Sequence, residues 1–263
     1  GGSLESKWSS ELDIPVHGYD IFDALVNFWC VLLSRPNDLA DKLRELKPTK
    51  EEYENIKEIL LRWDYTQDML KDWHTDYYKR EAIQLSDLDA AAYYYHNHNL
   101  SYGPMYLGWM SKIYQSQTKW DKMTNYIGSY RNPNLKVSKA SFDEVIPDYP
   151  DDLIYLDPPY YLKKDDDNKM LKGMYPNCNI DVHHTGFNHE LLRDLLHNHK
   201  GTFILSYNNC ATIREYYKDF TLVYPEWHYS YQAGETRVGK YKKERGVEHN
   251  KKESHEILII KDS

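Results

Sequence analysis

The sequence contains few cysteines and lacks any long apolar run. Its three cysteines, Cys30, Cys178 and Cys210, lie far apart and match no metal-binding spacing. Widely spaced thiols are typical of reducing compartments, so we expect a cytoplasmic protein of a bacterial or virus-infected host cell. No stretch approaches the roughly 18 apolar residues that cross a bilayer, which predicts no membrane association. The chain begins Gly1-Gly2-Ser3, without an initiator methionine or a secretion signal, as expected of a fragment.

Complete metal-binding patterns are also missing. Histidines occur in close pairs at His183-His184, at His96 with His98 and at His197 with His199. No third and fourth ligand follows any pair at a zinc-like spacing. We therefore predict a protein without a bound metal.

Positive charge is scarce overall but locally concentrated. The net charge is -8, from 33 basic and 41 acidic residues, which is unusual for a nucleic-acid-binding protein. Binding requires only a local positive surface, however. Two basic segments supply one, with Trp120, Tyr126, Tyr130 and Tyr241 interspersed: Lys112, Lys119, Lys122, Arg131, Lys136 and Lys139, then Arg237, Lys240, Lys242, Lys243, Arg245, Lys251 and Lys252. Such segments indicate either nucleic-acid contact or merely solvated faces.

The first part of the chain predicts one strand followed by helices. A short strand over 16–19 ends at Asp20, and an apolar face predicts a helix over 23–34. Pro36 starts a second helix, through Leu46. Thr49 with Glu52 forms a capping box that opens a helix to about Trp73, and Ser86 with Asp89 opens another through Tyr95.

Beyond Pro133, short apolar strands alternate with helices. We predict strands over 153–156, 202–206, 222–224 and 256–260, and helices over 190–196 and 213–217. This alternation predicts an α/β fold with a parallel or mostly parallel sheet and helices on both faces. Residues 1–46 and 134–263 would form one catalytic domain, and 47–133 a helical insert.

The most informative motif is Asp157-Pro158-Pro159-Tyr160, which directly follows an apolar strand. Ligands of open α/β sheets bind beyond the carboxyl ends of strands. An amino group conjugated to a purine ring is a poor nucleophile, and two fixed acceptors on its N–H groups would favour a pyramidal nitrogen. Asp157 and the Pro158 carbonyl can provide them, while Tyr160 can stack on the base, worth roughly 1–3 kcal/mol. The alternative is a plain strand-ending turn.

On this motif the sequence resembles the Dam-like adenine-specific DNA methyltransferases, over most of its length. The resemblance implies a Rossmann-like methyltransferase sheet, S-adenosylmethionine as the cofactor and Asp157, Pro158, Pro159 and Tyr160 as the catalytic residues. An early cofactor element, a long insert and then the catalytic turn match the alpha order of these enzymes, so the insert would recognise the target. The expected activity is site-specific methylation of the exocyclic 6-amino group of a flipped adenine in double-stranded DNA, as in restriction-modification.

The resemblance also implies a cofactor site. Asp20 would accept hydrogen bonds from the ribose hydroxyls, and Ser141-Phe142 resembles the segment beside the adenine of the cofactor, where the family often has an acid. Gly1-Gly2-Ser3 matches the tail of the family's glycine-rich cofactor turn, or is a linker remnant. Residues 90–95, followed by 100–103, resemble the family's segment near the target site. Phe187 and His189 fall in a stretch that resembles the start of its pocket-lining helix, and 203–209 resemble the strand that follows. The implied cofactor-binding residues are Gly1, Gly2, Ser3, Asp20, Ile21, Ser141, Phe142 and Asp157.

A base inside a duplex must be flipped out to reach such a site, so the distorted DNA needs further contacts. Residues 232–250 are basic and contain Gly234, Gly239 and Gly246, which predicts a protruding β-hairpin or a disordered basic loop. The expected DNA-binding residues are Tyr102, Lys119, Lys122, Arg131, Arg237, Lys240, Lys242 and Lys243.

Two other functions are compatible with these residues. The same acceptor geometry would suit an RNA adenine or a protein side-chain amide. A catalytically impaired DNA-binding subunit could also keep the fold, since the strand that precedes the family's glycine-rich turn is not in this sequence.

Overall fold

The computed structural model describes residues 3–66, 81–102, 106–112, 115–161, 187–225, 228–229, 252–253 and 255–262. The chain divides into two compact units, Gly1–Val145 and Ile146–Ser263. No helix within the described ranges is both long and apolar enough to cross a membrane.

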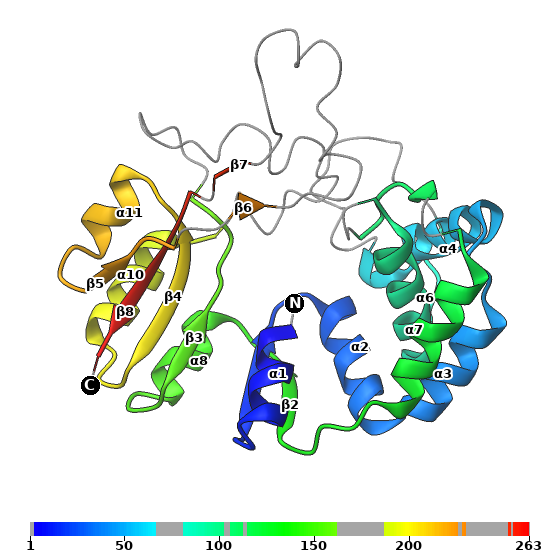
Figure 1. Ribbon diagram of the computed structural model, residues 1–263, viewed down its shortest axis with the longest axis horizontal. Coiled ribbons are helices and arrows are strands. Elements are labelled where there is room, and N and C mark those ends of the chain that lie inside the picture. Colours follow the sequence, from blue (N-terminus) through cyan, green and yellow to red (C-terminus); the bar gives the residue numbers. More distant parts are fainter. Residues whose placement is uncertain are drawn as a thin grey trace, which may run out of the picture. The chain divides into compact units, whose positions relative to one another are not determined.

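The first unit is mainly helical (Figure 1). Its elements are α1 (Ser3–Glu11), β1 (Val16–Asp20), α2 (Asp23–Ser34), α3 (Pro36–Glu45), α4 (Lys50–Arg62), α6 (Asp87–Leu100), α7 (Gln117–Ser129) and β2 (Leu135–Lys139). The unit boundary falls within α8 (Phe142–Asp148). The division into a catalytic domain and a 47–133 insert stays a prediction.

Apolar faces join these helices in pairs. Helix α2 packs on α6, and α3 packs on α7. Trp120 on α7 is almost completely buried, and its Nε1 donates to the Leu43 carbonyl on α3 over 3.1 Å. A buried indole N–H that lacked this acceptor would lose its hydrogen bond to water without replacement, so the bond helps to fix how the two helices pack.

Local signals explain where several helices start. Pro36 is the first residue of α3, where its missing N–H costs nothing. The Thr49 side chain accepts from Glu52 N at α4, and the Ser86 side chain accepts from Asp89 N at α6. The predicted starts of these three helices are confirmed.

One predicted helix end is outside the described residues, and another is wrong. Helix α4 ends at Arg62, because Trp63 leaves the helical conformation and forms a parallel bridge with Ile83. Residues 64–66 are helical again, and the predicted end near Trp73 lies outside the described ranges. Helix α6 continues past Tyr95 to Leu100, since its last turns remain buried.

A parallel pair of strands completes the first unit. Strand β1 pairs with β2 from Val16 opposite Leu135 to Asp20 opposite Lys139. Strand β1 was predicted, whereas β2 was not. Both strands therefore end at the same edge, with Asp20 at the carboxyl end of β1.

The second unit contains a four-stranded sheet with α10 (His189–Asn198) and α11 (Ala211–Tyr216) alongside it (Figure 1). The strands lie in the order β3-β4-β8-β5, with bounds β3 Ile154–Leu156, β4 Phe203–Asn208, β8 Glu256–Lys261 and β5 Thr221–Val223. A separate antiparallel pair joins β6 (His228–Tyr229) to β7 (Lys252–Glu253).

The predicted mostly parallel sheet is not what these strands form. Strand β3 is parallel to β4, but β8 is antiparallel to both of its neighbours. The sheet is therefore mixed, and a single Rossmann-like sheet stays a prediction. Alternate residues of its central strands are fully buried: Phe203, Leu205 and Tyr207 on β4, with Ile257 and Ile259 on β8.

Candidate active site

The Asp157-Pro158-Pro159-Tyr160 turn directly follows β3 in the second unit. Because β3 and β4 are parallel, the turn leaves the sheet at the carboxyl ends of both strands. The Asp157 side chain is exposed, and the next three residues are half-buried. The proline rings restrict the backbone here and remove two N–H donors. The turn therefore places an exposed carboxylate beside two proline residues, whose backbones can only accept hydrogen bonds.

Two side chains of the sheet hold the end of this turn. The Tyr160 hydroxyl donates to Glu256 Oε1 over 2.6 Å. Tyr161 N donates to Asn208 Oδ1 over 2.7 Å, and Asn208 Nδ2 donates to the Tyr161 carbonyl over 3.1 Å. Asn208 and Glu256 lie directly opposite each other, Asn208 at the end of β4 and Glu256 at the start of β8. One pair of opposite residues in the sheet thus binds Tyr160 and Tyr161, which are consecutive in the chain.

Glu256 lies in an unfavourable place for a charge. Burial raises the pKa of its carboxyl group, and the nearby Asp157 carboxylate raises it further. The hydrogen bond from Tyr160 opposes both effects because it stabilises the ionised form. The Tyr160 hydroxyl is thus the contact that favours a charged Glu256.

Aromatic rings pack around Tyr161, which is buried. Its ring meets the His189 ring edge-on at 5.1 Å between centroids, and Phe187 contacts the same histidine at 4.9 Å. His189 Nδ1 shares a hydrogen bond of 2.5 Å with the Tyr207 hydroxyl on β4. Phe187 and His189 were expected near the target pocket; His189 lies beside the residue that follows the turn, and Phe187 lies beside His189.

Asp20 ends β1 in the first unit and shapes the turn into α2. Its Oδ1 accepts from Phe22 N over 2.7 Å. Among the residues with described positions, none donates a hydrogen bond to Oδ2. Ile21 next to it is 47% exposed. One carboxylate oxygen and one apolar side chain are thus available to a ligand here.

The segment that follows β2 lies next to Asp20. Ala140 N donates to the Asp20 carbonyl over 3.3 Å, and Lys139 Nζ pairs with Asp23 Oδ2 at 2.7 Å. Ser141 and Phe142 follow at the start of α8, both half-buried. Glu144 Oε2 accepts from Ser141 N over 3.1 Å, so this acid completes the helix start. The structure therefore brings Asp20, Ile21, Ser141 and Phe142 to one edge of the β1–β2 pair.

Aromatic rings of the first unit pack against Phe22, close to this edge of the β1–β2 pair. The Phe22 ring contacts the rings of Tyr65, Tyr94 and Tyr106 at centroid distances of 6.1, 6.0 and 5.3 Å. The Tyr65 hydroxyl accepts from Asp23 N over 3.2 Å. Burial raises the pKa of Tyr65, so its hydroxyl stays neutral.

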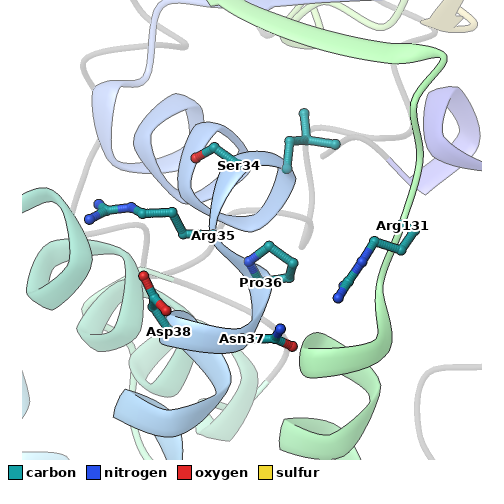
Figure 2. A pocket seen from close by; sticks show the side chains of 7 residues that line it. Ser34, Arg35, Pro36, Asn37, Asp38 and Arg131 are labelled. Atoms are coloured by element: carbon teal, nitrogen blue, oxygen red, sulfur yellow. The ribbon is translucent and has the colours of Figure 1, made fainter.

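The predicted DNA contacts on α7 share one face. Lys119, Lys122 and Tyr126 follow the helical repeat and are exposed, while Trp120, Thr124 and Ile127 are buried. Arg131 follows the helix and lines a hollow of about 410 Å³ with Leu33, Ser34, Arg35, Pro36, Asn37 and Asp38 (Figure 2). Tyr102, which precedes α7 in the chain, is 55% exposed.

Several predicted site residues fall outside the described ranges. These are Gly1 and Gly2 of the cofactor turn and, in the basic segment, Arg237, Lys240, Lys242 and Lys243. Ser3 begins α1, and its side chain is not described. The antiparallel strands β6 and β7 flank the basic segment, but the predicted hairpin over 232–250 itself lies outside.

Sequence reasoning missed Asn208 and Glu256. Each is a polar residue at one end of an apolar strand, and this pattern was the available signal. Asn208 ends one strand, and Glu256 begins another. In the same described ranges, no group of three or more His, Cys, Asp or Glu side chains is placed to hold a metal ion.

Comparison with known families agrees with this arrangement. The sequence profile of D12 class N6 adenine-specific DNA methyltransferases matches residues 12–231, a range that includes both strand ends and the turn. The chain is therefore of the S-adenosylmethionine-dependent methyltransferase class. It belongs to the D12 class N6 adenine-specific DNA methyltransferase family. The predicted resemblance and methyl donor are confirmed, and the family's substrate is DNA. A search of curated protein sequences finds no match to the chain.

Proposed function

We propose that the protein transfers a methyl group from S-adenosylmethionine to the exocyclic 6-amino group of a flipped adenine at specific sites in double-stranded DNA. Asp157, Pro158, Pro159 and Tyr160 form its catalytic centre in this proposal. The main support is the fixed turn at the ends of β3 and β4, anchored through Tyr160 and Tyr161. Because these hydrogen bonds hold both Tyr160 and Tyr161, they restrict the conformation of the turn and therefore the positions of its acceptors.

The proposed chemistry follows from what the turn exposes. The Asp157 carboxylate accepts from one N–H of the amino group, and the Pro158 carbonyl accepts from the other. The nitrogen lone pair then leaves conjugation with the ring and points out of its plane. The charge on Asp157 makes its hydrogen bond the stronger of the two. Rate enhancement comes chiefly from this orientation, since the transfer is a direct displacement.

Tyr160 would stack on the extruded base. Its ring is only half-buried, and its hydroxyl already has an acceptor in Glu256. A ring tethered at its tip loses little further freedom when a base stacks on it, which favours binding.

The edge of the β1–β2 pair fits the methyl donor. Asp20 Oδ2 has the acceptor chemistry that ribose hydroxyls require, and Ile21 and Phe142 are apolar partners for a purine ring. S-adenosylmethionine supplies an electrophilic methyl group when bound. Ser141 offers a hydroxyl and Asp157 a carboxylate to the same ligand in this proposal, with residues 1–3 adding backbone contacts.

DNA contacts would come from two basic segments. Lys119, Lys122 and Arg131 belong to the first, with Tyr102 as a further contact, and Arg237, Lys240, Lys242 and Lys243 belong to the second. The first segment lies in the 47–133 range proposed as the target-recognition insert. The exposed lysine face of α7 supports this assignment.

Transfer of labelled methyl groups to unmethylated duplex DNA tests the proposal. The full-length protein should incorporate label, and Asp157→Ala should reduce the rate at least about 100-fold, as expected for removal of a fixed polar contact to the reacting group. Asp219→Ala removes an exposed acid elsewhere in the same unit and should have no effect. A wild-type rate in Asp157→Ala would contradict the assignment of the turn.

Two further measurements address the other functions. Preference for RNA over duplex DNA in competition would contradict the proposed substrate. DNA binding without thermal stabilisation by S-adenosylmethionine would instead identify an impaired DNA-binding subunit.

A further inference from the structure

Glu256 and Asn208 take no direct part in the proposed chemistry, yet both are buried polar residues that contact its catalytic turn. Glu256 is 8% exposed and Asn208 is completely buried. Most buried side chains of their strands are apolar, such as Leu205 and Ile257. Burying a carboxylate or an amide is unfavourable unless it is hydrogen-bonded. Glu256 accepts a hydrogen bond from Tyr160, and Asn208 forms two hydrogen bonds with the backbone of Tyr161.

We propose that Glu256 and Asn208 are positioning residues for methyl transfer, which hold the Tyr160 ring and the Tyr161 backbone in the orientation that a stacked adenine requires. The proposal rests on the function proposed above for the turn. It adds the paired residues Asn208 of β4 and Glu256 of β8 to those on which the reaction depends.

Glu256 acts at the far end of the Tyr160 side chain. A tyrosine has two side-chain torsions, and packing on one side of a half-buried ring leaves it free to tilt. A hydrogen bond at the hydroxyl, 2.6 Å long, restrains the tilt because the acceptor belongs to a paired strand. Glutamine can accept the same bond through its amide oxygen, whereas alanine cannot.

Asn208 acts on the backbone instead. Its amide donates to the Tyr161 carbonyl and accepts from the Tyr161 N–H, as a neighbouring strand would. This pair of hydrogen bonds requires one donor and one acceptor on the same short side chain. Aspartate at this position would keep the acceptor but turn a carboxylate oxygen toward the Tyr161 carbonyl, so that contact would become repulsive.

Small displacements of the turn are costly because transfer depends on alignment. A misplacement of about 1 Å can reduce an enzyme's rate on the order of 100-fold. Loss of the anchors should therefore reduce kcat while leaving contacts with the rest of the DNA and the cofactor in place.

Steady-state methylation by the full-length protein tests this directly. We expect Glu256→Ala to reduce kcat about 10- to 100-fold with KM for DNA within about threefold, whereas Glu256→Gln should retain kcat within about threefold. Tyr160→Phe keeps the ring but loses the bond and should resemble Glu256→Ala. The Tyr160→Phe/Glu256→Ala double variant should lose no more than the single variants, since both remove one interaction. Glu215→Ala removes an exposed carboxylate paired with Lys218 and serves as the control.

An NMR signature separates positioning from general destabilisation. With tyrosine labelled at Cζ, the Tyr160 resonance, assigned through Tyr160→Phe, should shift in Glu256→Ala and stay near its wild-type position in Glu256→Gln. Asn208→Asp should lower kcat at least as much as Glu256→Ala. Should Glu256→Ala fail to fold, Tyr160→Phe and Asn208→Asp still decide the matter.

Unchanged kcat in Glu256→Ala and Asn208→Asp, with Asp157→Ala inactive, would overturn the positioning role but not the proposed function. Additive losses in the double variant, or an unmoved Tyr160 resonance, would also overturn it. A wild-type protein without any transfer would instead refute the proposed function, and the positioning role with it.

Discussion

At the scale of single residues, Gly201 occupies a place where no other side chain fits. A Cβ atom here would lie 2.3 Å from the Asp152 carbonyl oxygen, a backbone atom that cannot move aside. We predict that Gly201→Ala lowers the free energy of unfolding by about 1–3 kcal/mol, the usual cost of a forced overlap. Urea denaturation measures this. Gly18→Ala is the matched control, because its Cβ would meet its nearest neighbours at 3.8 Å; equal losses in the two variants would contradict the prediction.

The residues of the candidate site differ in how far the sequence could predict them. Asp20 ends one predicted strand and Asp157 directly follows another, so local pattern alone marks both as carboxylates at strand ends, where open α/β sheets bind ligands. Asn208 and Glu256 also lie at the ends of apolar strands, but this pattern does not indicate which residues they contact. Their contact with the turn depends on the register of β8 against β4, which is set by the packing of residues far apart in the chain.

At the scale of elements, α6 carries two histidines that resist protonation. The His96 ring is fully buried beside Trp120, with its Nε2 bonded to the Lys47 carbonyl, and the His98 ring stacks on Tyr94. Burial lowers the pKa of both histidines to about 4. The contacts of α6 with its neighbours therefore require His96 and His98 to be uncharged.

The consequence is a loss of stability in mild acid. The unfolded chain takes up these protons below about pH 6.5, whereas the folded chain resists until about pH 4. The stabilisation is complete above the unfolded pKa and is lost as the pH falls toward 4. At pH 5 each histidine should cost about 2 kcal/mol. His98→Phe keeps a ring against Tyr94, so urea titrations at pH 7.5 and 5 should show a smaller loss in the variant; equal losses would argue against a buried neutral His98.

Element starts were easier to predict than element ends or partners. Pro36, Thr49 and Ser86 act within one helical turn, so local sequence suffices. The end of α4 depends instead on a bridge to Ile83, some distance along the chain. Strand β2 was missed because its two lysines and serine resemble a basic loop, and its strand character depends on pairing with β1.

At the scale of the whole molecule, a net charge of -8 must coexist with a polyanionic substrate. Each phosphate contact contributes about 0.9 to the slope of log affinity against log salt. If Lys119 and Lys122 each contact one phosphate, replacing both with alanine should reduce that slope by about 1.8. Filter binding across a salt series measures it. The control is the double alanine variant of Lys7 and Lys218, which pair with Glu11 and Glu215. If the Lys119/Lys122 variant has the same salt slope as this control and the wild type, α7 is not part of the DNA interface.

The overall arrangement was predicted only in outline. Alternating strands and helices indicated an α/β protein, and the family comparison agrees. The direction of β8 was not predictable, because an apolar run such as Ile257–Ile260 is equally suited to parallel and antiparallel pairing. Strand direction depends on the path of the chain before β8, and that path is a property of the whole second unit.

Strand β8 follows β3, β4 and β5 in the sequence but lies between β4 and β5. During synthesis, then, a ribosome releases the Asp157 turn long before it releases the glutamate that steadies Tyr160. A nascent or prematurely terminated polypeptide would carry the motif without its support. If the turn is catalytic as proposed, such incomplete products should methylate DNA more slowly than the chain that contains β8.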